Sequence, residues 1–160
     1  MSTRGEFLPY PEPTAEGGFN EAPLPALAAP GTGLAAKWDE AQAATLNGTP
    51  VQLDPRDLGF WACRFSGEEM DILVIPKRTL ARRKANREKL TIEETDKALR
   101  LARVAAEADR VFGDPGKSSR WLRKRNAALA GNSPLDLLKS ETGARAVDDL
   151  LGQIDHGLFS

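Results

Sequence analysis

Apolar residues recur at helical spacing over long stretches of the chain, above all in its second half. One stripe lies within residues 91–112 and another within residues 142–154, each repeating every three or four positions. The stripe residues are Leu101, Val104, Ala105, Ala108, Val111 and Phe112, with Leu99 and Ala102 at the edge, and then Val147, Leu150, Leu151 and Ile154. No segment alternates apolar and polar residues over strand length, so the pattern predicts an all-α protein.

Capping residues predict where the helices begin and end. Thr91 with Glu94 forms a capping box that opens the longest helix, and Gly113 follows its last residue. Ser66 is an N-cap candidate for a short helix, and Asp54-Pro55 is typical of an N-cap followed by the first helical residue. The helix that begins at Asp54-Pro55 would carry the apolar stripe Leu58, Trp61, Ala62 and Phe65. Further helices are predicted over residues 34–46, 78–84, 117–123 and 135–140.

The first 33 residues differ from the rest because they hold six prolines and five glycines. Proline removes backbone donors and glycine adds chain entropy, so we expect an extended arm. The predicted organisation is the arm at residues 1–33, a helical domain at residues 34–112 and a second helical domain at residues 113–160.

Composition excludes several classes of site. The chain of 160 residues has one cysteine, Cys63, and one histidine, His156, which excludes an internal disulfide and the multi-cysteine and two-histidine metal motifs. His156 has no nucleophile in a recognisable motif, and Asp148 and Asp149 point in different directions on a helix, so we expect no enzyme activity, no metal and no cofactor. Without a membrane span or a signal peptide, the expected compartment is the cytoplasm.

Charge is concentrated in one segment, although the net charge is only −1. Residues 77–89 hold seven basic residues and one acidic residue, a balance of +6. This segment follows a short helix and a break at Val74-Ile75-Pro76, the layout of a helix-turn-helix whose second helix enters the DNA major groove. The candidate DNA contacts are Lys77, Arg78, Thr79, Arg82, Arg83, Lys84 and Arg87.

In this layout Leu80 would pack on Ile72 and Ile75, while Lys77, Arg78, Arg82 and Arg83 would point outward. The turn departs from the usual pattern because Val74 occupies the position where glycine is common, and a β-branched residue resists a positive φ. Either the turn is rebuilt around Pro76, or the motif no longer reads DNA.

Three stretches carry a family resemblance. They are RTLARRK (78–84) with KLTIEETDKALRLARV (89–104), ADRVFGD (108–114) with RWLRKRNAALAGNSPLDLL (120–138), and SETGARAVDDLLGQIDHGLFS (140–160). Together they cover about two-thirds of the chain, and residues from about 50 to 160 resemble the Xre/MbcA/ParS family of antitoxins.

The resemblance implies a type II antitoxin whose partner is a RES-domain toxin that consumes NAD, by degrading it or by transferring ADP-ribose. It implies that the C-terminal domain covers the toxin's NAD pocket, and that the N-terminal domain dimerises and binds its operator, giving a homodimer and a hetero-oligomer with the toxin. The alternative is a helix-turn-helix transcription regulator whose main partner is DNA. Both readings can hold together.

The resemblance places the toxin contacts at the end of the chain, at Asp148, Asp155, His156, Gly157, Leu158, Phe159 and Ser160. A six-residue tail reaches at most about 20 Å, and Gly157 would let it leave the helix axis. From the residues alone, we expect Leu158 and Phe159 to fold back on the core, whereas the resemblance favours insertion into the toxin pocket or contact with its rim. Trp121 is expected to anchor the core of the second domain. The basic residues Arg120, Arg123, Lys124 and Arg125 would meet DNA phosphates, the acidic arm of a dimer mate or the toxin.

Overall fold

The computed structural model describes residues 40, 41, 43, 44 and 46–157. The described residues form helices and no strand, so the all-α prediction is confirmed there. Residues 40, 41, 43, 44 and 46 are helical, as predicted for this part of residues 34–46, and six α-helices and two 3-10 helices follow between Asp57 and Asp155. The elements are η1 (Asp57–Cys63), α2 (Gly67–Leu73), α3 (Lys77–Asn86), α4 (Ile92–Phe112), α5 (Pro115–Arg123), η2 (Ala127–Leu129), α6 (Pro134–Leu137) and α7 (Glu141–Asp155). The predicted arm at residues 1–33 and the tail residues Leu158, Phe159 and Ser160 lie outside the described residues.

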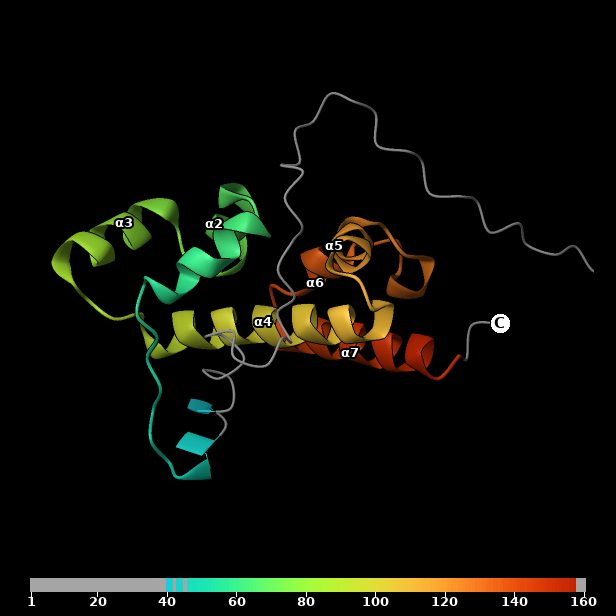
Figure 1. Ribbon diagram of the computed structural model, residues 1–160, viewed down its shortest axis with the longest axis horizontal. Helices are drawn as coiled ribbons and strands as arrows, with labels where there is room; N and C mark the ends of the chain where they lie inside the picture. Colours follow the sequence, from blue (N-terminus) through green and yellow to red (C-terminus); the bar gives the residue numbers. More distant parts are fainter. Residues whose placement is uncertain (1–39, 42, 45, 158–160) are drawn as a thin grey trace, which may run out of the picture.

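Helix α4 is the central element, with 21 residues and a length of about 30 Å. Helices α5 and α7 both pack against it, and α7 runs beside it in the same direction (Figure 1). The predicted stripe of α4 faces this core, and Leu101, Val104, Ala105 and Ala108 are almost completely buried. None of the helices among the described residues is long and apolar enough to cross a membrane.

The capping box predicted at Thr91 and the N-cap predicted at Ser66 are both confirmed, and Ser66 proves to be part of a capping box as well. At the start of α4 the Glu94 amide donates to the Thr91 hydroxyl at 3.1 Å, and the Thr91 amide donates to the Glu94 carboxylate at 2.8 Å. Ser66 and Glu69 make the same reciprocal pair at the start of α2. Helix α4 ends at Gly113, whose φ of 64° is readily adopted by glycine.

The helix predicted from Asp54-Pro55 is wrong in type and in start, because the observed element is the 3-10 helix η1 from Asp57. The Asp54 carboxylate accepts from the Arg56 amide at 2.8 Å, and the Asp57 carboxylate accepts from the Asp54 amide at 3.0 Å. These bonds close a turn before the helix. A 3-10 helix repeats every three residues, so Leu58, Trp61 and then Arg64, its C-cap, all come to the buried side.

The same Asp-Pro signal works as an N-cap at the start of α5. The Asp114 carboxylate accepts from the Lys117 amide at 2.6 Å, and Pro115 takes the first helical position, two residues before the predicted start. Trp121 of α5 is buried and stacks at a tilt on Phe112, with ring centroids 5.3 Å apart. The prediction that Trp121 anchors the core is confirmed.

Helices α6 and α7 approach each other closely at one glycine. A Cβ atom on Gly143 would lie 2.1 Å from the carbonyl oxygen of Leu137, well inside any allowed contact. The Ser140 hydroxyl accepts from the Gly143 amide at 3.0 Å and caps the helix at the same point. Only glycine fits there, which gives the glycine of the SETGARAV stretch a packing role.

Candidate binding surfaces

Helix α3 presents most of its positive charge to solvent. No residue of α3 is fully buried, and the helix lies at one end of the molecule, away from α5 and α6 (Figure 1). The exposed cations among the predicted DNA contacts are Lys77, Arg78, Arg82, Lys84 and Arg87, while Thr79 is half-buried. An exposed cationic helix of this kind is suited to phosphate contact.

Arg83 does not point outward, so its predicted orientation is wrong. Its side chain is 13% exposed, with Nε 3.0 Å from Glu94 and Nη1 3.5 Å from Glu88. Nη1 also donates to the Lys89 carbonyl at 3.2 Å. Because each helical residue turns by about 100°, Arg83 faces the start of α4 while Arg82 faces solvent.

The apolar contacts around α3 also differ from the prediction. Ile72 is 64% exposed and does not lie beneath Leu80. Leu80 is partly buried against the core, to which the buried Ile75 also belongs. In the α2–α3 connection the side chains of Val74 and Ile75 are therefore buried in the core, whereas Ile72 of α2 remains on the surface.

The connection between α2 and α3 forms without a left-handed residue. Val74 has φ −125° and ψ −66°, and the amides of Val74 and Ile75 both donate to the Met70 carbonyl at 3.0 Å. Pro76 then precedes α3 with φ −54°. The turn is thus rebuilt around a shared carbonyl and Pro76, which was one of the two outcomes expected for Val74.

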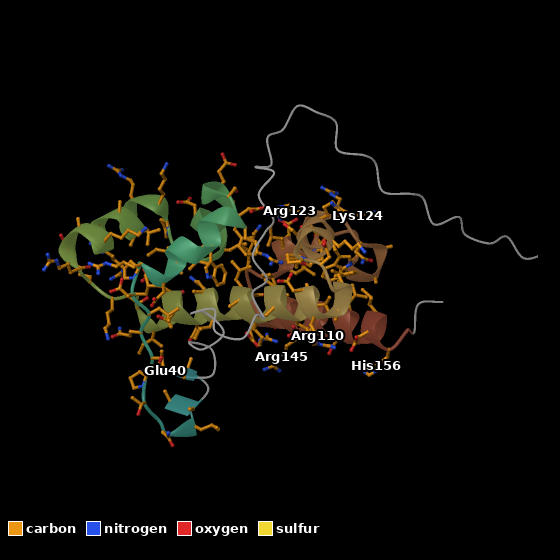
Figure 2. The ribbon with its side chains drawn as sticks, in the orientation of Figure 1. Glu40, Arg110, Arg123, Lys124, Arg145 and His156 are labelled. Atoms are coloured by element: carbon orange, nitrogen blue, oxygen red, sulfur yellow. The ribbon has the colours of Figure 1, made fainter. Side chains whose placement is uncertain are left out.

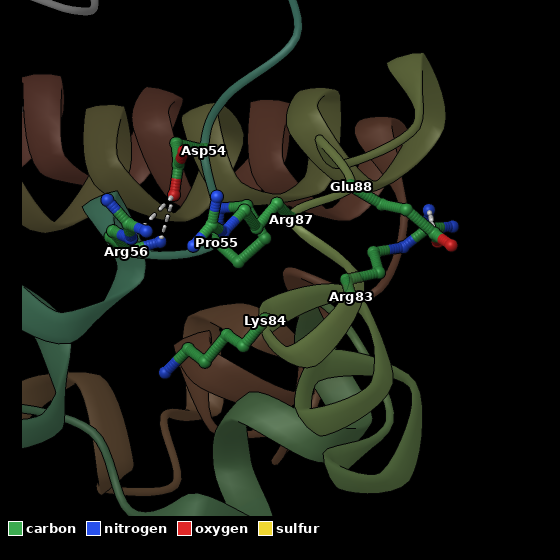
Figure 3. Close-up of a pocket in the computed structure, with 7 residues that line it drawn as sticks. All are labelled: Asp54, Pro55, Arg56, Arg83, Lys84, Arg87 and Glu88. Atoms are coloured by element: carbon green, nitrogen blue, oxygen red, sulfur yellow. Dashed lines mark hydrogen bonds and ion pairs between the residues drawn. The ribbon is translucent and has the colours of Figure 1, made fainter.

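A small hollow continues the positive surface beyond the C-terminal end of α3 (Figure 3). It is lined by Asp54, Pro55, Arg56, Arg83, Lys84, Arg87 and Glu88. Four of these side chains are cationic and two are anionic, and Arg56 comes from the separate segment that precedes η1. Two anionic side chains lie beside cations, since Asp54 is 4.0 Å from Arg56 and Glu88 is 3.5 Å from Arg83.

The carboxylates of α7 face the arginines of α4. Arg100 lies 2.9 Å from Glu141, Arg103 binds Asp148, and Arg110 lies 2.8 Å from Asp155. The second and third pairs bring in Asp148 and Asp155, two of the predicted toxin contacts. Both carboxylates are therefore used within the chain.

The environment of these two carboxylates differs. Its hydrogen bond with Arg110 lowers the pKa of Asp155, so that carboxylate stays ionised. Burial raises the pKa of Asp148, and the hydrogen bond with Arg103 offsets part of that increase. Asp155 is thus an exposed, firmly charged group at the end of α7, whereas Asp148 is a half-buried one.

Asp155, the last residue of α7, is exposed, and so are the two residues that follow it, His156 and Gly157. Gly157 has φ 66°, and its amide donates to the Ile154 carbonyl at 3.1 Å, so the right-handed helical conformation ends there. Figure 2 shows His156 and Arg110 toward the same end of the molecule. Leu158, Phe159 and Ser160 follow outside the described residues.

The sequence reasoning missed a buried polar cluster. The Arg64 and Asp109 side chains are 1% and 4% exposed and pair with each other, although 45 positions separate them. The available signals were weak, because Arg64 lies three residues after Trp61 and Asp109 directly follows the stripe residue Ala108. Nothing local shows that these two positions meet.

Comparison with known proteins assigns a domain to the C-terminal part of the chain. Residues 107–157 match the family model described as the antitoxin Xre/MbcA/ParS C-terminal toxin-binding domain. An antitoxin Xre of Yersinia enterocolitica is 35% identical over 142 residues, covering 82% of this chain and 95% of the relative.

Two further relatives match shorter segments. An antitoxin Xre of Pseudomonas putida is 38% identical over 84 residues, covering 52% of this chain and 53% of the relative. A protein of Sphingobium named Prs ADP-ribosylating antitoxin is 29% identical over 99 residues, covering 56% and 62%. The match to the Yersinia protein extends over almost its whole length. The chain therefore belongs to the Xre/MbcA/ParS family of antitoxins of toxin–antitoxin systems, and its C-terminal part is the toxin-binding domain.

Proposed function

We propose that this antitoxin neutralises a RES-domain toxin that consumes NAD, by degrading it or by transferring its ADP-ribose, and that the C-terminal domain and tail cover the NAD pocket. The proposed toxin contacts are Asp148, Asp155, His156, Gly157, Leu158, Phe159 and Ser160. The name of the Sphingobium relative, Prs ADP-ribosylating antitoxin, supports this choice of chemistry, because NAD is the ADP-ribose donor in such reactions.

The observation that carries the proposal is the way α7 ends. Arg110 pairs with Asp155 of the last turn at 2.8 Å, and Gly157 then ends the helical conformation with a left-handed φ of 66°. The tail therefore starts from a defined point at the end of the toxin-binding domain, and the three remaining residues include two apolar side chains, Leu158 and Phe159. A short apolar tail on a fixed base is suited to entering a cleft.

The test is truncation of this tail. One variant ends at Gly157 and a second ends at Ile154, and each is titrated against the RES-domain toxin encoded beside the antitoxin gene while NAD consumption is followed. We expect at least a tenfold loss of inhibition for the longer truncation and a smaller loss for the shorter one. The unfolding temperature is the control for the fold. Full inhibition by both variants rejects pocket occlusion by the tail.

We also propose that α2 and α3 form a helix-turn-helix that binds operator DNA, and that the antitoxin represses its own operon as a dimer. The exposed cations of α3, Lys77, Arg78, Arg82 and Lys84, support this. Binding to the DNA upstream of its gene should weaken steeply as salt rises, because neutralised phosphates release counterions. A flat salt response argues against it, and mass measurement in solution tests the dimer. If DNA binding persists but no RES-domain toxin is bound, the alternative of a regulator with DNA as its main partner is favoured.

A further inference from the structure

A buried ion pair joins the segment before α2 to the toxin-binding domain. Arg64, which follows η1, donates from Nη1 to Asp109 of α4 at 2.6 Å and from Nη2 to the other oxygen of the same carboxylate. Nη2 also lies 2.7 Å from the Ser118 hydroxyl of α5. Two parallel bonds to one carboxylate fix the orientation of both partners as well as their distance.

A second ion pair joins the same two parts of the chain, but here the arginine belongs to the toxin-binding domain and the carboxylate to α2. Arg123, at the end of α5, donates from Nε and Nη2 to the two carboxylate oxygens of Glu69 in α2, both at 2.8 Å. Nη2 also donates to the Arg64 carbonyl at 2.9 Å. The guanidinium carbon lies 5.8 Å from the centre of the Phe65 ring. Figure 2 labels Arg123 where α5 faces α2.

These contacts cross the boundary of the toxin-binding domain. Asp109, Ser118 and Arg123 lie within residues 107–157, whereas Arg64 and Glu69 lie outside them. A buried carboxylate needs a charged partner, since burial of an unpaired charge is strongly unfavourable. Asp109 and Arg123 also bond to Ser118 and Ser119 of the domain, but their charged partners come from the segment formed by η1 and the start of α2.

We propose that the toxin-binding unit is larger than residues 107–157 and includes the η1–α2 segment, with Arg64 and Arg123 as positioning residues for the surface that meets the toxin. Loosening this segment then weakens toxin binding even though it need not touch the toxin. The inference rests on the assignment of the chain as an antitoxin. The proposed RES-domain partner enters only as the probe in the binding experiment.

Glu69 and Glu68 provide a matched pair for the test. Both are acidic, both lie in the first turn of α2 and both are outside residues 107–157, but Glu68 is exposed while Glu69 holds Arg123. In the full chain, Glu69→Ala should weaken binding of the RES-domain toxin about tenfold at a temperature where the protein stays folded. Glu68→Ala should change it less than about twofold. Ser66→Ala opens the capping box but leaves the Glu69 carboxylate beside Arg123, so its effect should also be small.

A second measurement needs no toxin. Trp61 lies in η1 and Trp121 in α5, so each reports one side of the bridges once Trp38 and the other tryptophan are replaced by Phe. Chemical unfolding followed by the two probes should coincide in the parent and separate after Glu69→Ala or Arg64→Met. If toxin affinity is unchanged and the transitions still coincide, the bridges only stabilise the fold and the proposal is rejected. If the parent fails to bind the RES-domain toxin, the proposed partner is wrong, and the separation of the two transitions decides the inference.

Discussion

Helices α3 and α4 both carry several arginines, yet they use them in opposite ways. The α4 arginines Arg100, Arg103 and Arg110 each face a carboxylate of α7, which runs beside them. The α3 residues Arg78 and Arg82 are exposed on a helix with no fully buried residue. The difference comes from the neighbouring helix. A basic face is available for a ligand only where no carboxylate is packed against it.

Arg83 sharpens this contrast because it lies in α3 but its side chain pairs with a carboxylate of α4. It lies next to Arg82, but Glu94 of α4 holds it at 3.0 Å. Membership of the run of basic residues therefore does not decide its role. Changes at Asp109, Arg82, Arg83 and Arg100 test the contrast between ion pairs inside the fold and exposed cations on α3, and a change at Gly143 tests the packing of α6 against α7.

The largest effect is expected where a buried pair is broken. Asp109→Ala leaves Arg64 buried without its carboxylate and should lower the free energy of unfolding by about 3–5 kcal/mol. Asp96→Ala, at an exposed position of the same helix, should change it by less than about 0.5 kcal/mol. Denaturant titration of both variants measures the difference. Equal, small effects would mean that the pair contributes little to the fold.

A steric change between α6 and α7 should be next in size. Gly143→Ala brings a methyl group against the Leu137 carbonyl and should cost about 1–3 kcal/mol, because the two helices must separate. Gly152→Ala on the same helix meets no atom within 4 Å, and better helix propensity should stabilise by about 0.5–1 kcal/mol. Thermal unfolding distinguishes the two. Similar shifts in both variants would contradict the close approach.

The neighbours Arg82 and Arg83 separate ligand binding from stability. Arg83→Gln should lower the free energy of unfolding by about 1 kcal/mol, since Glu94 loses its partner, and should leave DNA affinity nearly unchanged. Arg82→Gln should leave stability unchanged and, if Arg82 neutralises a phosphate, reduce the slope of log affinity against log salt by about 0.9. Titrations of operator DNA at several salt concentrations provide the comparison. The reverse result would place the DNA contact at Arg83.

The smallest expected effect is on how the free energy of unfolding depends on pH under acidic conditions. The hydrogen bond with Arg100 lowers the pKa of Glu141, so this pair stabilises the fold fully above the unfolded pKa of about 4.3 and less as pH falls through the folded value. Asp148 acts in the opposite sense, because burial raises its pKa and its protonation favours the folded state as pH falls.

Arg100→Gln should therefore reduce the loss of stability between pH 6 and pH 3. We expect a change of less than about 1 kcal/mol, because Glu141 is half exposed and the pair is screened by solvent. Unfolding midpoints of the parent and the variant at both pH values measure it. An unchanged difference between the two pH values would show that the pair does not contribute.

Membership of an antitoxin family agrees with the expectation that the chain is not an enzyme, and the family match assigns toxin binding to residues 107–157. The exposed cations of α3 lie outside that match and carry the separate proposal of DNA binding.

The sequence by itself determined what depends on near neighbours. Residues three or four positions apart set the capping boxes of Thr91 and Ser66, the end of α4 at Gly113 and the apolar stripes of α4 and α7. Among the described residues, only the tertiary structure decided which charged side chains pair within the fold and which are exposed. Arg64 meets Asp109 across 45 positions, and Arg123 meets Glu69 across 54. Such pairs form because distant helices pack together and bury their charges, and no local spacing records that packing.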